Sequence, residues 1–120
     1  MHRRYSIKGK KVFQTIYKLG KRKQGQALRI ITLPDLKENS AITKISPKVK
    51  IAITISKKYG KAWQRNKAKR RIRSILTKLI SEIKDGFYII ISLKNQGRET
   101  SFLSLEKELK FLLKKSDLIN

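Results

Sequence analysis

The sequence predicts an α+β fold in which helices pack on a mainly antiparallel sheet. Three observations predict it. The apolar fraction of 39% is high enough for a folded domain. Three segments repeat apolar residues at helical spacing, and three others are β-branched or alternate between apolar and polar residues. The expected order is helix, strand, strand, helix, strand, helix, in one domain that spans residues 1–120.

The first half of the chain predicts one helix and one strand. Val12, Phe13, Ile16 and Tyr17 have helical spacing, and Gly20 is a plausible stop for this helix. Residues 26–34 read QALRIITLP, which is typical of a strand that ends at a proline. We interpret the polar residues that follow as a hairpin connection to the next strand. The region 21–47 leaves room for one further strand.

The second half predicts two strands and two helices. Residues 48–56 alternate, with Val49, Ile51, Ile53 and Ile55 on one face, as in a strand with one buried face. Residues 87–93, FYIIISL, are typical of a central strand covered by helices. A helix is expected at about 62–84, and another at 102–116. The apolar stripe of the first of these helices is Ala68, Ile72, Ile75, Leu76, Leu79, Ile80 and Ile83. That of the second is Leu105, Leu109, Leu112 and Leu113.

Charge is the dominant property of the composition. Thirty-one Lys and Arg face eight Asp and Glu, which gives a formal net charge of +23. Residues 1–34 and 39–81 contain no acid at all. Such a chain repels itself, so its expected partner is a polyanion. No apolar run is long enough for a membrane span, and the absence of cysteine fits a reducing cytoplasm.

The second helix carries the sharpest functional signal. On a wheel of about 100° per residue, Arg65, Lys69 and Arg73 form a row along one edge of the buried stripe. This places Arg65 at the rim of an expected cleft between helix and sheet. Cations repel one another at this spacing and also oppose the helix dipole. Because phosphate groups reverse both effects, the row predicts a phosphate-binding surface.

Four further side chains have two possible roles each. Asn66 could donate to a phosphate or fix the loop before the helix. Trp63 could pack beside Ala62 or stack on a base, and we favour the packing role. Phe13 and Tyr17 share a helix face among lysines, so they form either a core pair or a platform for single-stranded nucleic acid.

The residues for protein-based RNA cleavage are missing from the sequence. General acid–base catalysis commonly uses two histidines, and His2 is the only one. No carboxylate cluster, cysteine nucleophile, Walker motif or dinucleotide loop is present. We therefore expect no catalytic residue in the protein, and we expect any chemistry to come from a partner.

The stretch ISKKYGKAWQRNKAKRRIR resembles the signature of the protein subunit of bacterial ribonuclease P. That signature combines an S-K-K-x-G turn, an R-N-R box and a K-R-x-x-R pattern on one helix. Similarity extends over nearly the whole chain. One departure is that Lys67 replaces the last arginine of the box, so the bidentate fork is lost. Another is that no aromatic stands near Ile31, where family members often carry one.

The resemblance implies three helices on a four-stranded sheet with a left-handed β-α-β crossover. It implies a catalytic RNA that holds Mg²⁺, with no metal held by the protein alone, and that cuts the 5′ leader from precursor tRNA. Phe13 and Tyr17 would line a cleft for the single-stranded leader. The catalytic RNA would face the turn and the second helix at Lys57, Lys58, Arg65, Asn66, Lys67, Lys69, Arg70 and Arg73.

Two other functions compete with this one. A ribosomal or general RNA-binding protein would show the same steep dependence on salt, so co-purified RNA must separate the two. A DNA-binding module would use the basic helix in a major groove. The wide buried stripe of that helix leaves few side chains for base edges, which argues against the DNA module.

Overall fold

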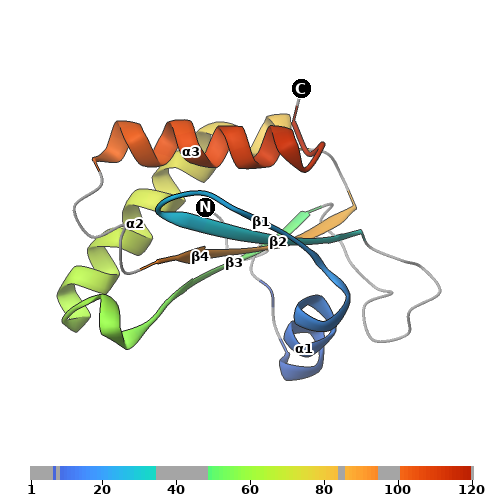
Figure 1. Cartoon of the computed structure of the whole chain (residues 1–120), viewed down its shortest axis with the longest axis horizontal. Coiled ribbons are helices and arrows are strands. Elements are labelled where there is room, and N and C mark those ends of the chain that lie inside the picture. Colours follow the sequence, from blue (N-terminus) through green and yellow to red (C-terminus); the bar gives the residue numbers. More distant parts are fainter. Residues whose placement is uncertain (1–6, 8, 35–48, 84–85, 95–100, 120) are drawn as a thin grey trace.

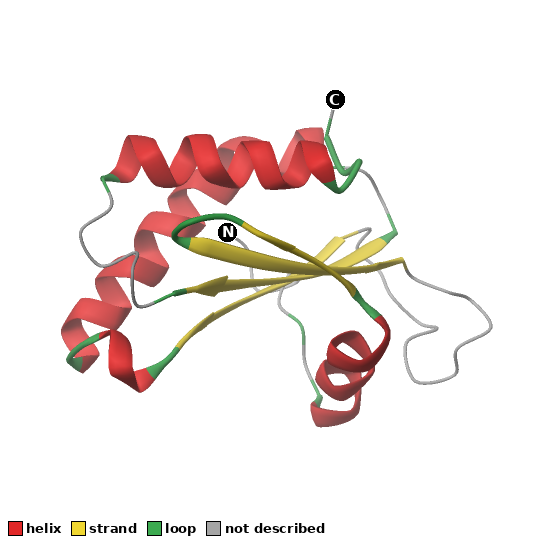
Figure 2. Cartoon of the chain, viewed as in Figure 1, coloured by secondary structure: helices red, strands yellow, loops and turns green. Residues whose placement is uncertain are grey.

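The computed structural model describes residues 7, 9–34, 49–83, 86–94 and 101–119. Figure 2 shows helices on both sides of one sheet. In chain order the elements are helix α1 (Lys10–Leu19), strands β1 (Lys21–Gln24), β2 (Leu28–Pro34) and β3 (Val49–Ile55), the 3₁₀ turn η2 (Lys57–Tyr59), helix α2 (Ala62–Leu79), the 3₁₀ turn η3 (Ile80–Glu82), strand β4 (Phe87–Leu93) and helix α3 (Phe102–Lys115).

The sheet is mixed and has the order β1-β2-β4-β3. β1 pairs with β2 and β2 pairs with β4 in antiparallel fashion, whereas β3 and β4 are parallel. The predicted α+β class, with three helices and four strands, is confirmed. β1 is the further strand for which the sequence left room.

The predicted hairpin between β2 and β3 is wrong, because β4 lies between these two strands. Ile89, Ile90 and Ile91 of β4 are all fully buried, so this strand needs cover on both faces and neighbours on both edges. The central place of the FYIIISL segment is therefore confirmed. The connection itself, residues 35–48, lies outside the described residues.

α2 connects the parallel neighbours β3 and β4 as a crossover. The left hand of this crossover stays a prediction from the resemblance. The helix ends at Leu79, earlier than expected, and η3 carries the chain on in a tighter turn. Ile83 is still buried, so the last part of the predicted stripe reaches the core.

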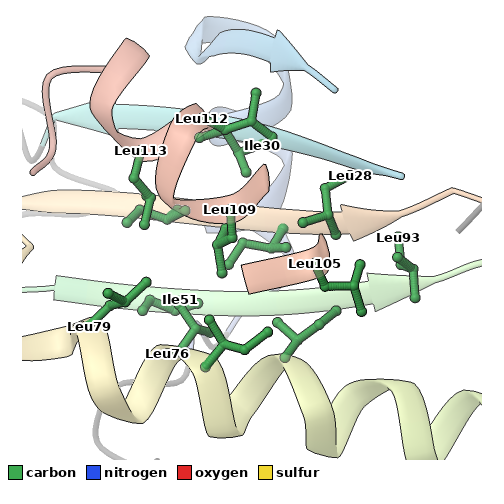
Figure 3. Packing of buried hydrophobic residues seen from close by; sticks show 14 of the residues in the cluster. Leu28, Ile30, Ile51, Leu76, Leu79, Leu93, Leu105, Leu109, Leu112 and Leu113 are labelled. Carbon is green, nitrogen blue, oxygen red and sulfur yellow. The ribbon is translucent and has the colours of Figure 1, made fainter. Parts of the chain in front are cut away.

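Two hydrophobic clusters lie on opposite faces of the sheet. In Figure 1, α3 and much of α2 cover one face, and α1 lies against the other. Figure 3 shows the larger cluster, where leucines of α2 and α3 meet inward-facing side chains of the sheet such as Ile30 and Ile51. The smaller cluster joins Ile16 of α1 to Ile31 and Ile90. α1 covers only part of its face, which leaves room there for a surface hollow.

A carboxylate locks α3 onto the β1–β2 turn. Oε1 of Glu108 accepts the backbone N–H groups of Gln26 (2.8 Å) and Ala27 (3.1 Å). Oε2 accepts those of Ala27 (3.0 Å) and Leu28 (2.6 Å). A Cβ on Gly25 would stand 2.6 Å from the Glu108 carboxyl carbon, so this close approach requires glycine. The contact fixes the start of β2 beneath α3.

Candidate nucleic-acid interface

The turn before α2 presents two lysines because a tyrosine anchors it. Tyr59 is buried against the larger cluster, and its N–H donates to the carbonyl of Ser56 at 3.0 Å. The Ser56 hydroxyl accepts the N–H of Lys58 at 3.1 Å and so caps η2. With the tyrosine pointing inward, the side chains of Lys57 and Lys58 are exposed.

The first turn of α2 is tied to the preceding loop. Gln64 Oε1 accepts the backbone N–H of Lys61 at 2.7 Å. Arg65 is half buried, and its Nη1 donates to the Gly60 carbonyl at 3.1 Å. A Cβ on Gly60 would meet the end of the Gln64 side chain, which would have to move from its contact with the Lys61 N–H. Arg65 therefore holds the turn against the helix while it keeps its charge at the surface.

The outer face of α2 gathers cations around a shallow hollow. Asn66, Lys69, Arg70 and Arg73 line it together with Trp63, and its volume is about 490 Å³. A smaller hollow of about 210 Å³ lies on the other side of Trp63, and its cations are Lys67 and Arg71. Of the predicted RNA-facing residues, four thus meet at one hollow and Lys67 stands at the other.

The packing role that we favoured for Trp63 is wrong. Its side chain is 62% exposed. On the wheel, Trp63 falls at about 160° from Arg65, which is almost opposite the middle of the buried stripe. The position of Trp63 on the helix, rather than its size, decides where the indole lies.

No side chain of α2 balances these charges. The first turn of α2 has no acidic residue. Within the described part of the chain, no carboxylate lies within ion-pair distance of Lys67, Lys69, Arg70 or Arg73. The positive end of the helix dipole adds to the field. The face is therefore an unneutralised electropositive surface, to which a phosphate chain is the complementary ligand.

A third hollow lies on the α1 side of the sheet and has a volume of about 480 Å³. Tyr17, which is 36% exposed, lines it together with Arg29 of β2 and Lys94 at the end of β4. Its floor includes Thr54 and Ser92, whose hydroxyls are 2.8 Å apart. The hollow therefore combines one aromatic ring, two cations and neutral hydroxyls.

The two aromatic side chains of α1 have different surroundings in the structure. Phe13 is half buried and packs against the smaller cluster, whereas Tyr17 lines the hollow. The leader cleft predicted from the sequence included Phe13 and Tyr17 but not Arg29 and Lys94, which line this hollow. Arg29 could have been found from the alternation in β2, because it must point away from the face of Leu28 and Ile30. Its Nε is buried without a hydrogen-bond partner among the described residues.

The side chain of Lys94, which contributes to the lining of the hollow, is held by the β1–β2 turn. Its Nζ donates to Gln24 Oε1 and to the Gly25 carbonyl, both at 2.9 Å. Among the described residues, no group of three or more His, Cys, Asp and Glu is placed to hold a metal ion. None of the described helices is long and apolar enough to cross a membrane.

Comparison with known proteins decides the family. The family model described as Ribonuclease P matches residues 1–117. The chain belongs to the ribonuclease P protein family. Members of this family are protein components of ribonuclease P, an endoribonuclease of tRNA processing, and the chain is accordingly a subunit of such an enzyme.

Curated relatives of the ribonuclease P family support this over most of the chain. The ribonuclease P protein component of Picosynechococcus sp. is 39% identical over 109 residues, which cover 90% of this chain and 86% of that protein. The component of Microcystis aeruginosa is 35% identical over 117 residues, covering 97% and 93% of the two chains.

The fold agrees with solved structures of the same family. The ribonuclease P protein of Staphylococcus aureus has a TM-score of 0.81 and 29% identity, and the match covers 97% of this chain and 98% of that one. The protein from Thermotoga maritima shares the fold, with a TM-score of 0.76 and 23% identity. The family assignment implies association with ribonuclease P RNA.

Proposed function

We propose that the chain binds ribonuclease P RNA through the basic face of α2 and holds the 5′ leader of precursor tRNA in the hollow beside α1. The observation that carries this proposal is the presence of cationic hollows on two separate surfaces of the described structure, the outer face of α2 and the α1 side of the sheet. One surface serves the permanent RNA partner and the other serves the substrate.

The hollow beside α1 suits a single strand better than a duplex. A base can stack on the Tyr17 ring only when it is unpaired. Arg29 and Lys94 supply cations for backbone phosphates, and the Thr54 and Ser92 hydroxyls can bond to sugars or bases without selecting a sequence. These features support a leader site that tolerates many leader sequences.

The cleavage chemistry belongs, in this proposal, to the RNA partner and the Mg²⁺ that it binds. The sequence supports it, because the chain offers one histidine, no cysteine and only eight dispersed acids. The contribution of the protein is to neutralise phosphates and to position the leader. Both effects should be greatest at low Mg²⁺, where the RNA has fewer counterions of its own.

We expect Tyr17→Ala and Lys94→Ala each to reduce the preference for leader-bearing substrate by about 5–150-fold. The loss corresponds to one base stack of roughly 1–3 kcal/mol or one charge-assisted contact. The measurement is the dissociation constant of the reconstituted holoenzyme at low Mg²⁺ for precursor tRNA and for mature tRNA. Binding of mature tRNA should be unchanged.

Leu19→Ala is the matched control for this test, because Leu19 is exposed on the same helix and is not part of the hollow. It should keep the full preference for the leader. Equal affinity of the unmodified holoenzyme for both RNAs would exclude a leader site. An equal loss for both RNAs in the Tyr17 and Lys94 variants would place these residues in general RNA binding instead.

A further inference from the structure

Trp63 is the only tryptophan of the chain, and most of its side chain is exposed to solvent. It is the second residue of α2 and points away from the helix stripe that enters the core. A large aromatic side chain normally contributes most when it is buried. An indole that is 62% exposed in the middle of a cationic face is therefore available for contact with a partner from outside the chain.

The indole separates two cationic hollows. It lines the larger one with Asn66, Arg70 and Arg73, and it lines the smaller one with Lys67 and Arg71. Their volumes are about 490 and 210 Å³. The arrangement is thus a ring with phosphate-binding side chains on both flanks.

The chemistry of one ligand matches this arrangement. An unpaired nucleotide has a flat base for stacking and a phosphate on each side of its sugar. Bases inside a duplex are already stacked on each other, so a helical RNA segment could reach the cations but not the indole face. Stacking of a base on an aromatic ring is tolerant of base identity and is strengthened by neighbouring cations.

We propose that Trp63 is a stacking platform for an unpaired nucleotide of ribonuclease P RNA, whose neighbouring phosphates lie in the two hollows. This inference rests on the proposed function, because it takes α2 as the surface that meets the catalytic RNA. It adds a base contact to a surface that otherwise offers only charge. The stack would make this point of α2 selective for an unpaired nucleotide, because contacts to phosphates position a nucleic acid but do not distinguish an unpaired base from a paired one.

The lone tryptophan allows a direct test. Ribonuclease P RNA is titrated into the full-length protein while tryptophan emission is followed, and any change reports Trp63 alone. We expect saturable quenching that parallels binding. Trp63→Ala should bind about tenfold more weakly, and Trp63→Phe should remain within about threefold of the unmodified protein because it keeps a stacking ring.

Salt dependence separates stacking from charge. Trp63→Ala should leave the slope of log K against log salt unchanged, whereas Lys67→Ala should reduce its magnitude by about one. A Trp63→Ala variant that also lowers the slope would show that the indole only positions the cations, which overturns the proposal. Phe111→Ala removes an exposed ring of α3 and should change neither affinity nor slope.

Two further results would overturn the stacking site. One is unaltered emission on binding together with unaltered affinity of Trp63→Ala. The other is equal quenching by a fully paired RNA hairpin, which has no unpaired base to stack. Failure of the proposed function is distinct from both, because the unmodified protein would then bind ribonuclease P RNA no better than an unrelated RNA of equal length.

Discussion

Replacement of Lys69, Arg70 and Arg73 by alanine together is expected to weaken binding of ribonuclease P RNA by on the order of 10²–10³-fold near 0.1 M salt. These three side chains line the larger hollow of α2, and none has an ion-pair partner among the described residues. Each lost phosphate contact removes about one counterion-release step, so the salt slope should fall by about three. Filter binding or titration at several salt concentrations measures both quantities.

A second triple variant controls for net charge. Lys107, Lys110 and Lys114 are exposed on α3, which lies on the other side of the sheet from α1. Their replacement by alanine removes the same charge and should weaken binding less than about tenfold. Equal weakening by the two triple variants would mean that the RNA responds to total charge rather than to α2. Arg65 is left out of the test because it also bonds to the Gly60 carbonyl.

Glu108→Ala is expected to lower the free energy of unfolding by about 2–4 kcal/mol, a large share of the stability of a domain of this size. The variant leaves the N–H groups of Gln26, Ala27 and Leu28 without their acceptor in a half-buried turn. It also uncouples α3 from the start of β2. Urea-induced unfolding followed by circular dichroism measures the change.

Two variants make this stability prediction specific. Glu108→Gln keeps one acceptor oxygen, so it should lose less than the alanine variant. Glu106→Ala removes a carboxylate of the same helix that has no hydrogen bond among the described residues, and it should change the free energy by less than about 0.5 kcal/mol. Equal losses for Glu106→Ala and Glu108→Ala would contradict the anchoring role.

The strongly periodic elements could be predicted from the sequence. The FYIIISL run identified the central strand, and the leucines of 102–116 identified α3 with its buried face. These predictions succeed because burial of a continuous apolar face dominates the local energetics. The end of the first helix at Gly20 was also predictable, because glycine commonly follows the last residue of a helix. In the structure a Cβ there would meet the Ile16 carbonyl and the Ile31 side chain.

Long-range pairing could not be predicted in the same way. β1 reads Lys-Arg-Lys-Gln and has no apolar signal of its own, because its role is to pair with the edge of β2. The hairpin prediction for 35–47 failed because adjacency in sequence suggested pairing, whereas burial of β4 on both faces placed it in between. Glu108 meets a turn about 80 positions earlier in the chain, which no local pattern reveals.

The types of residue in the candidate site were predicted more fully than their arrangement in space. The row of cations on α2 and the aromatic pair of α1 were visible as patterns. The hollow beside α1 also needs Arg29 and Lys94, which come together only when β2 and β4 pair. The exposure of Trp63 could have been predicted from its angular position on the helix, opposite the buried stripe. The large apolar side chain suggested burial instead.

The most direct test of the central claim is a site-specific crosslink from α2 to ribonuclease P RNA. Because the chain has no cysteine, Ser74→Cys gives one attachment point for a photo-crosslinker, on an exposed position of α2. Leu103→Cys gives the matched point on α3, where the native side chain is 67% exposed. The account predicts efficient crosslinking to one region of the RNA from position 74 and little from position 103. Equal crosslinking from both positions, or none from position 74 in an active holoenzyme, would contradict it.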